Sequence, residues 1–158
     1  MIRAIFACDD DWGIGKGNLL PWPHNSADLK WFKECTDNSV VVMGRYTWES
    51  LPKKPLPNRM NVVVSKHNIN EGPNIIVPPG EALKRIVTLN FSKNVWIIGG
   101  AQTLELFLPV IDEIWLSRIR GTYDCDTYLP RTVIELAYNM TQSEKQGNLY
   151  IEKWSKIV

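Results

Sequence analysis

Residues 95–104 read Val95-Trp96-Ile97-Ile98-Gly99-Gly100-Ala101-Gln102-Thr103-Leu104, a short apolar run, two glycines and then a helix-forming stretch. This order predicts a buried strand that turns tightly into a helix. Glycine lets the backbone approach a ligand closely, and the first turn of a helix offers unpaired N–H groups to a phosphate. The stretch therefore fits a pyrophosphate site, with a simple tight turn as the alternative.

The same alternation of strand and helix extends outward from this stretch. Strands are expected at 2–8, 40–43, 61–64, 74–77, 94–98, 113–119, 132–140 and 149–154, and helices at 26–36, 45–50, 80–87 and 101–107. Such alternation predicts an α/β fold with a mostly parallel, eight-stranded central sheet and about four flanking helices. The last two strands, joined by residues 143–148, should form an antiparallel hairpin. At 158 residues we expect a single domain over residues 1–158.

Composition narrows the class of protein. With 44% hydrophobic and 22% charged residues and a net charge of +1, the chain has no strong field for nucleic acid or acidic membranes. No apolar run approaches the roughly 18 residues of a membrane span, and the N-terminal apolar run is too short for a signal peptide. Three widely spaced cysteines indicate a reducing compartment, so we expect a cytoplasmic protein. Two histidines without ligand spacing favour no metal site.

Two long connections, residues 9–25 and 120–131, lack a helix or strand pattern. Long loops in a compact domain are usually functional or disordered. The first contains Gly13, Gly15, Gly17, Pro21 and Pro23, a mixture of flexible and stiff positions that suits a gate.

Asp28 stands where the helix 26–36 should carry an apolar residue, because Trp31, Phe32 and Cys35 share its face. A carboxylate on a buried stripe is costly unless something pairs with it or uses it. The alternative is an ordinary first-turn acid, behind Ser26 as N-cap, that complements the helix dipole.

Cationic residues follow other predicted strands. Arg45 begins a helix, where a cation is unfavourable unless an anion lies nearby, and Ser65 and Lys66 follow the strand at 61–64. Together they could form a phosphate pocket at the carboxyl edge of the sheet, although the Rossmann and Walker patterns are absent. Arg59, between stiff flanks, could grip a carboxylate or could be a solvated surface residue.

Read jointly, these residues resemble the dihydrofolate reductase family along the whole chain. The resemblance is carried by residues 13–22 (GIGKGNLLPW), 27–33 (ADLKWFK), 40–51 (VVVMGRYTWESL), 55–65 (PLPNRMNVVVS), 95–102 (VWIIGGAQ) and 124–130 (DCDTYLP). It implies NADPH-dependent reduction of 7,8-dihydrofolate to 5,6,7,8-tetrahydrofolate, supporting one-carbon metabolism and thymidylate synthesis, by a monomeric enzyme whose partner is this small substrate.

The resemblance also implies roles for individual residues. Asp28 matches the acid that pairs with the pterin, Trp22 the residue that orients a water, Leu20 the mobile gate and Ser117 the hydroxyl linked to the acid. The substrate site is implied to comprise Asp28 and Ser117 with Ile5, Leu29, Phe32, Lys33, Leu51, Lys54, Leu56, Arg59 and Ile98.

The implied NADPH site draws on the gate, both helix starts and the basic positions. Its members are Ala7, Ile14, Gly15, Asn18, Leu19, Gly44, Arg45, Tyr46, Thr47, Ser65, Lys66, Gly99, Gly100, Ala101, Gln102, Thr103, Leu104 and Thr127. The chain departs from common family patterns at Ala101, Gln102, Leu104 and Cys125, which bear on cofactor grip and loop motion.

Two other functions compete with this interpretation. The related reductase of riboflavin synthesis shares the fold, but its substrate lacks the glutamate tail that Arg59 would grip. A non-catalytic folate- or nucleotide-binding protein would not need an acid, a gate and phosphate-binding residues together.

Overall fold

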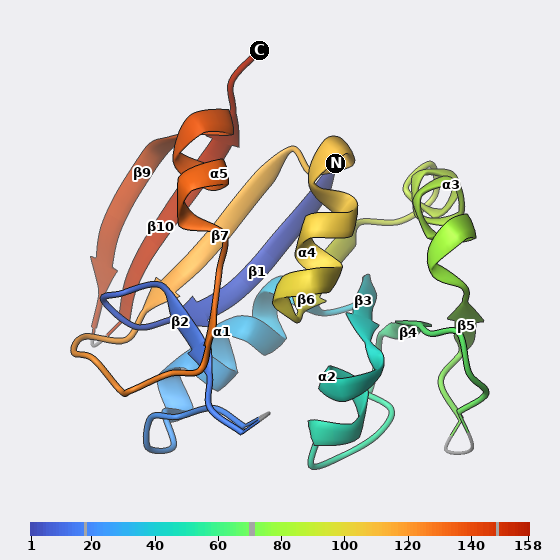
Figure 1. Ribbon diagram of the computed structural model, residues 1–158, viewed down its shortest axis with the longest axis horizontal. Helices are drawn as coiled ribbons and strands as arrows, with labels where there is room; N and C mark the ends of the chain where they lie inside the picture. The colour runs from blue at the N-terminus through green and yellow to red at the C-terminus, as the bar shows by residue number, and fades with distance from the viewer. Residues whose placement is uncertain (18, 70–71, 148) are drawn as a thin grey trace.

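The computed structural model describes residues 1–17, 19–69, 72–147 and 149–158, and a sheet of eight strands in the order β5-β4-β3-β6-β1-β7-β10-β9 runs through it (Figure 1). Its strands are β1 (Ile2–Cys8), β3 (Val40–Gly44), β4 (Met60–Val64), β5 (Ile75–Val77), β6 (Val95–Gly99), β7 (Glu113–Arg118), β9 (Tyr138–Gln146) and β10 (Leu149–Lys156). The six strands from β5 to β7 are parallel, whereas β10 and β9 complete the sheet as an antiparallel hairpin. The predicted α/β sheet and its C-terminal hairpin are confirmed.

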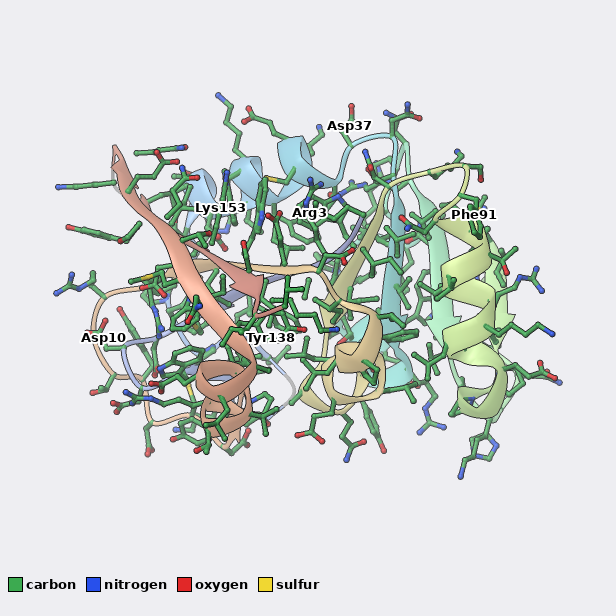
Figure 2. All side chains as sticks on the ribbon, turned by 90° about the horizontal axis from the view of Figure 1, so that it is seen from above. Arg3, Asp10, Asp37, Phe91, Tyr138 and Lys153 are labelled. Atoms are coloured by element: carbon green, nitrogen blue, oxygen red, sulfur yellow. The ribbon has the colours of Figure 1, made fainter. Side chains whose placement is uncertain are left out.

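Helices cover both faces of the sheet. They are α1 (Ser26–Thr36), α2 (Arg45–Ser50), α3 (Pro79–Leu89), α4 (Ala101–Phe107) and α5 (Arg131–Ala137), with a short 3₁₀ turn η1 (Leu108–Val110). Helix α1 lies on the opposite side of the sheet from α4 and α5 (Figure 2). Two layers of helix on one sheet therefore produce two separate cores.

Strand β1 feeds both cores because successive side chains of a strand point to opposite faces. Ala4 and Phe6 join the core beneath α3, α4 and α5, whereas Ile5 joins Trp31 of α1 in the second core. Complete burial of an aliphatic side chain such as Ile5 contributes about 1.5–3 kcal/mol. Both faces of this central strand are thus fixed by packing.

One predicted strand is wrong in part. Residues 132–140 were expected to be a strand, but α5 occupies the first six of them and β9 begins only at Tyr138. Val133 and Leu136 are exposed while Ile134 and Tyr138, four residues apart, are buried, which is helical spacing. Strand β9 then continues through positions 143–146, which were expected to lie in the hairpin loop.

The N-cap of α1 also differs from expectation. Asn25, not Ser26, caps the helix, because its side-chain oxygen accepts a hydrogen bond from the backbone N–H of Asp28 at 3.0 Å. Asp28 therefore lies in the first turn, where the helix dipole favours a negative charge.

The two long connections pair with each other. Strand β2 (Gly13–Gly15) and strand β8 (Thr127–Tyr128) form a small antiparallel sheet of their own. Neither strand was predicted. We call residues 13–20 the gate segment and residues 120–131 the supporting loop.

Within the described residues, none of the helices has the length and apolar character needed to cross a bilayer.

Candidate active site

Asp28 and Ser117 form the centre of the site. Asp28 is only 7% exposed, Ser117 is completely buried, and the Ser117 hydroxyl donates a hydrogen bond to Oδ1 of Asp28. Ser117 lies near the carboxyl end of β7, opposite Ala7 of β1. Burial raises the pKa of Asp28, and the bond from Ser117 lowers it in part. The arrangement keeps an acid in an apolar setting with one oxygen held in place.

An apolar wall adjoins this pair. Phe32, Leu51, Leu56 and Ile98 are half-buried and pack against the core that contains Ile5. The structure therefore brings together five of the predicted substrate residues, from α1, β1, β6 and the segment between α2 and β4.

Three other predicted substrate residues differ in their exposure to solvent. Leu29 is 44% exposed and Lys33 is exposed, both on α1. Lys54 is half-buried in the segment between α2 and β4.

Arg59 is held by its neighbours rather than loose in solvent. Its Nε donates to the carbonyl of Pro57 at 2.9 Å and its Nη1 donates to Oγ1 of Thr36 at 3.0 Å. The guanidinium also lies over the Phe32 ring, 5.9 Å from its centroid. Burial lowers the pKa of Arg59, and Asp37 opposes that shift. A guanidinium fixed beside an apolar wall suits recognition of a carboxylate.

The chain just after the gate segment packs against the supporting loop. Trp22 is buried and packs edge-on against Tyr123, with ring centroids 5.9 Å apart. Leu19 and Leu20 are 66% and 56% exposed, and Leu19 exchanges backbone hydrogen bonds with Lys16. The predicted cofactor residue Asn18 lies outside the described residues.

The other residues near the gate that were predicted to bind the cofactor lie where β2 pairs with β8. Ile14 is half-buried against the core, and Gly15 pairs with Thr127 across the two strands. The backbone of this part of the gate is therefore fixed by the supporting loop.

The starts of α2 and α4 interlock. A Cβ built on Gly44 would lie 2.7 Å from Oγ1 of Thr103, and one built on Gly99 would lie 2.9 Å from Oγ1 of Thr47. Gly99 also has φ of +153°, a conformation that favours glycine. Neither N-cap, Gly44 nor Gly100, carries a side-chain cap, so both helix starts retain their backbone donors for an anion.

Other predicted cofactor residues surround the two helix starts. Arg45 pairs with Glu49, Nε to Oε1 at 3.3 Å, so this carboxylate is one anion beside the cation. The Ser65 hydroxyl exchanges hydrogen bonds with the backbone of His67. Exposed members of the set are Tyr46, Lys66 and Gln102; half-buried members are Ala7 and Ala101.

Leu104 is placed differently from the rest of this set. Its side chain is fully buried in the core beneath α4, so it presents no surface to a ligand.

Sequence reasoning missed two acids of the loops. Asp9 is buried and accepts hydrogen bonds from both loops, and Asp126 accepts the backbone N–H of Gly17 at 2.8 Å. The sequence does contain a sign of Asp9, because this acid directly follows an apolar strand and burial there would need hydrogen-bond partners, as for Asp28.

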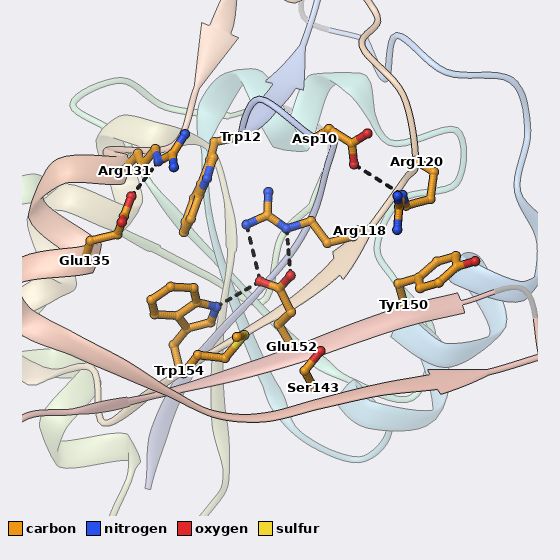
Figure 3. Close-up of a pocket in the computed structure, with 11 residues that line it drawn as sticks. Asp10, Trp12, Arg118, Arg120, Arg131, Glu135, Ser143, Tyr150, Glu152 and Trp154 are labelled. Atoms are coloured by element: carbon orange, nitrogen blue, oxygen red, sulfur yellow. Dashed lines mark hydrogen bonds and ion pairs between the residues drawn. The ribbon is translucent and has the colours of Figure 1, made fainter.

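A cavity of about 410 Å³ lies elsewhere, between the residues that directly follow β1 and the C-terminal hairpin (Figure 3). Arg118 and Glu152 line it, and none of the predicted site residues does. Over the ranges that the structure describes, no cluster of three or more His, Cys, Asp or Glu side chains could hold a metal ion.

Comparison with known proteins identifies the family. The model of the family described as dihydrofolate reductase matches residues 1–152. The chain belongs to the dihydrofolate reductase family. A dihydrofolate reductase of Buchnera aphidicola (subspecies Acyrthosiphon pisum) is 37% identical over 130 residues, which cover 82% of this chain and 78% of that protein.

Two further proteins of the dihydrofolate reductase family are also similar to this chain. The bifunctional dihydrofolate reductase-thymidylate synthase of Glycine max is 35% identical over 81% of this chain, which corresponds to 28% of that longer protein. The structure of a dihydrofolate reductase from Enterococcus faecalis complexed with NADP(H) and RAB-propyl superimposes with a TM-score of 0.84 at 25% identity, covering 99% of this chain and 96% of that one.

Proposed function

We propose that the chain reduces 7,8-dihydrofolate to 5,6,7,8-tetrahydrofolate with NADPH, and that Asp28 supplies the negative charge that makes the bound pterin reactive. The observation that carries this proposal is a buried carboxylate, fastened by Ser117, beside an apolar wall at the carboxyl edge of a parallel sheet. Ligands of open α/β sheets bind at that edge.

The acid acts through its charge on the substrate. Protonating the ring nitrogen of a C=N bond makes the adjacent carbon a better hydride acceptor. An ionised carboxylate shielded from water favours that protonated form more strongly than it would in bulk solvent. Ser117 fixes the orientation of the acid, and Trp22 orients the water that delivers the proton.

The substrate is held by shape and by one charge. The pterin and benzoyl rings lie against apolar side chains that pack together in one core, namely Ile5, Phe32, Leu51, Leu56 and Ile98. Arg59 grips the carboxylate of the glutamate tail, a role supported by the two hydrogen bonds that fix its position.

The residues at the two helix starts fit NADPH. When bound, this cofactor supplies the hydride. The uncapped starts of α2 and α4 offer backbone donors to its pyrophosphate. Arg45 and Lys66 offer positive charge to its 2′-phosphate, and Leu20 with its neighbours closes over the nicotinamide.

Dihydrofolate-dependent loss of NADPH absorbance tests the function directly. Turnover that saturates with both compounds is the expected result. Binding of dihydrofolate without turnover would instead favour a non-catalytic folate-binding protein. Turnover with a pyrimidine of riboflavin synthesis but not with dihydrofolate would favour that related reductase.

The proposal extends to the domain organisation, oligomeric state and cellular compartment of the protein. One domain spans residues 1–158, works as a monomer in the cytoplasm and binds no nucleic acid. Three unpaired cysteines support a reducing compartment, and a net charge of +1 supports the absence of a nucleic-acid partner. The largely exposed, polar strand β9 at the edge of the sheet supports a monomer.

A further inference from the structure

Asp9 is a buried acid that the proposed reaction does not use. It directly follows β1 and is 1% exposed. Its Oδ1 accepts the backbone N–H of Asp11 at 2.9 Å and of Gly13 at 2.8 Å. Its Oδ2 accepts the backbone N–H of Tyr123 at 3.2 Å and the thiol of Cys125 at 3.4 Å. One oxygen therefore faces the entry to the gate segment, and the other faces the supporting loop.

The backbone of Asp9 is fixed as firmly as its side chain. Nη1 of Arg118 donates to the Asp9 carbonyl at 3.0 Å. Nε and Nη2 of the same guanidinium donate to Glu152 at 3.1 and 3.2 Å, as Figure 3 shows. The guanidinium also lies 4.3 Å from the ring centroid of Trp12. Asp9 thus connects two long loops to the rigid centre of the sheet.

The contact between Asp9 and the two loops leaves no spare room. A Cβ on Gly13 would overlap the side chain of Cys125 and lie 3.1 Å from Oδ1 of Asp9. Burial, together with the neighbouring carboxylate, raises the pKa of Cys125 to about 11, so its thiol remains a proton donor. Burial alone would raise the pKa of Asp9, but the hydrogen bonds from Gly13, Tyr123 and the thiol lower it overall.

We propose that Asp9 is a positioning residue whose carboxylate fastens the gate segment to the supporting loop, and so sets how tightly the closed gate retains NADPH. The inference rests on the proposed function, because it assumes that the gate covers the nicotinamide. It assigns a role to an acid that precedes the gate segment in the sequence, whereas Asp28 follows that segment.

The substitution Asp9→Asn tests the hydrogen bonds of the carboxylate without changing the size of the side chain. The amide has almost the shape of the carboxylate but retains only one acceptor oxygen. Since each carboxylate oxygen now meets two donors, either orientation of Asn turns an NH₂ group toward two of them. Asp9→Asn therefore releases one of the two loops without creating a cavity.

The experiment measures how fast NADPH leaves the binary complex, by stopped-flow fluorescence with an excess of competing NADP⁺. Asp9→Asn should speed dissociation about tenfold, the scale of losing hydrogen bonds to a charged group. Dihydrofolate affinity, measured separately, should stay within about twofold, because the apolar wall and Arg59 do not touch Asp9. Asp11→Asn is the matched control, since it removes an exposed carboxylate two residues away.

Unchanged NADPH dissociation in Asp9→Asn overturns the proposal, as does an equal weakening of NADPH and dihydrofolate, which a general loss of structure would produce. If that variant does not fold, Cys125→Ser and Cys125→Ala decide. Serine keeps the donor and should leave dissociation unchanged, whereas alanine should speed it about threefold; identical rates in the two refute the role. Dissociation requires no turnover, so a missing reductase activity would count against the proposed function and not against this measurement.

Discussion

Replacing Asp28 by asparagine removes one negative charge at the centre of the site and leaves its shape. A unit charge about 4 Å from the protonated pterin ring, at an effective dielectric constant of about 20, stabilises that ring by roughly 4 kcal/mol. Each 1.36 kcal/mol corresponds to a factor of ten, so the loss should be on the order of 10³ in turnover, within the 10²–10⁴ range of a displaced proton donor. Ser117 can still donate to the amide oxygen, so the fold should persist.

The assay is dihydrofolate-dependent NADPH oxidation at saturating concentrations of both compounds, followed across acidic to alkaline pH. Glu34→Gln is the matched control, because it removes the same charge from the exposed side of the same helix. The deficit of Asp28→Asn should shrink toward acidic pH, since solvent then supplies the proton that the carboxylate no longer favours.

Turnover of Asp28→Asn within about threefold of the parent at neutral pH would refute the electrostatic argument. A deficit of equal size at every pH would also contradict it, because proton supply would then not be the step affected.

Three other outcomes follow from the site. Arg59→Ala should weaken dihydrofolate binding by about 1.5–3 kcal/mol while leaving a pterin without the glutamate tail unaffected; equal losses for both, in titrations, count against the carboxylate grip. The parent protein should give a higher kcat/KM with NADPH than with NADH, and the double variant Arg45→Ala, Lys66→Ala should reduce this difference. Equal kcat/KM values for the two cofactors in the parent protein would rule out the 2′-phosphate pocket. Burial raises the pKa of Asp28 above its ordinary value of 3.8, so the folded state holds that proton more tightly than the unfolded chain does. The parent should therefore lose stability relative to Asp28→Asn as pH rises above 3.8, until Asp28 is fully ionised. A stability difference that is constant in urea unfolding between about pH 4 and 8 would contradict this sign.

The sheet could be predicted from sequence because its strands are short apolar runs that alternate with helical patterns. Residues 132–140 were misassigned because Thr132, Val133 and Ile134 are β-branched and favour a strand, whereas the helix is decided by which side chains the core buries. Tertiary packing overrode local preference there.

The proposed catalytic acid could be found in the sequence because Asp28 interrupts an apolar stripe, and the structure buries it. The pairing of β2 with β8 was invisible, since it rests on backbone hydrogen bonds between segments more than a hundred residues apart. For the same reason the two distant donors to Asp9, the backbone N–H of Tyr123 and the thiol of Cys125, left no pattern in the chain. The roles of the individual site residues stay predictions for the experiments above.

The interlocked starts of α2 and α4 constrain how this sequence can diverge. Gly44 is opposed by Thr103, and Gly99 by Thr47, so each glycine leaves only the space that the hydroxyl residue on the other helix already fills. A larger residue at either glycine requires a smaller one opposite, and Gly99 must in addition keep its positive φ. Descendants of this chain should therefore change Gly44 and Thr103 as a couple, while Gly99 stays the same across lineages.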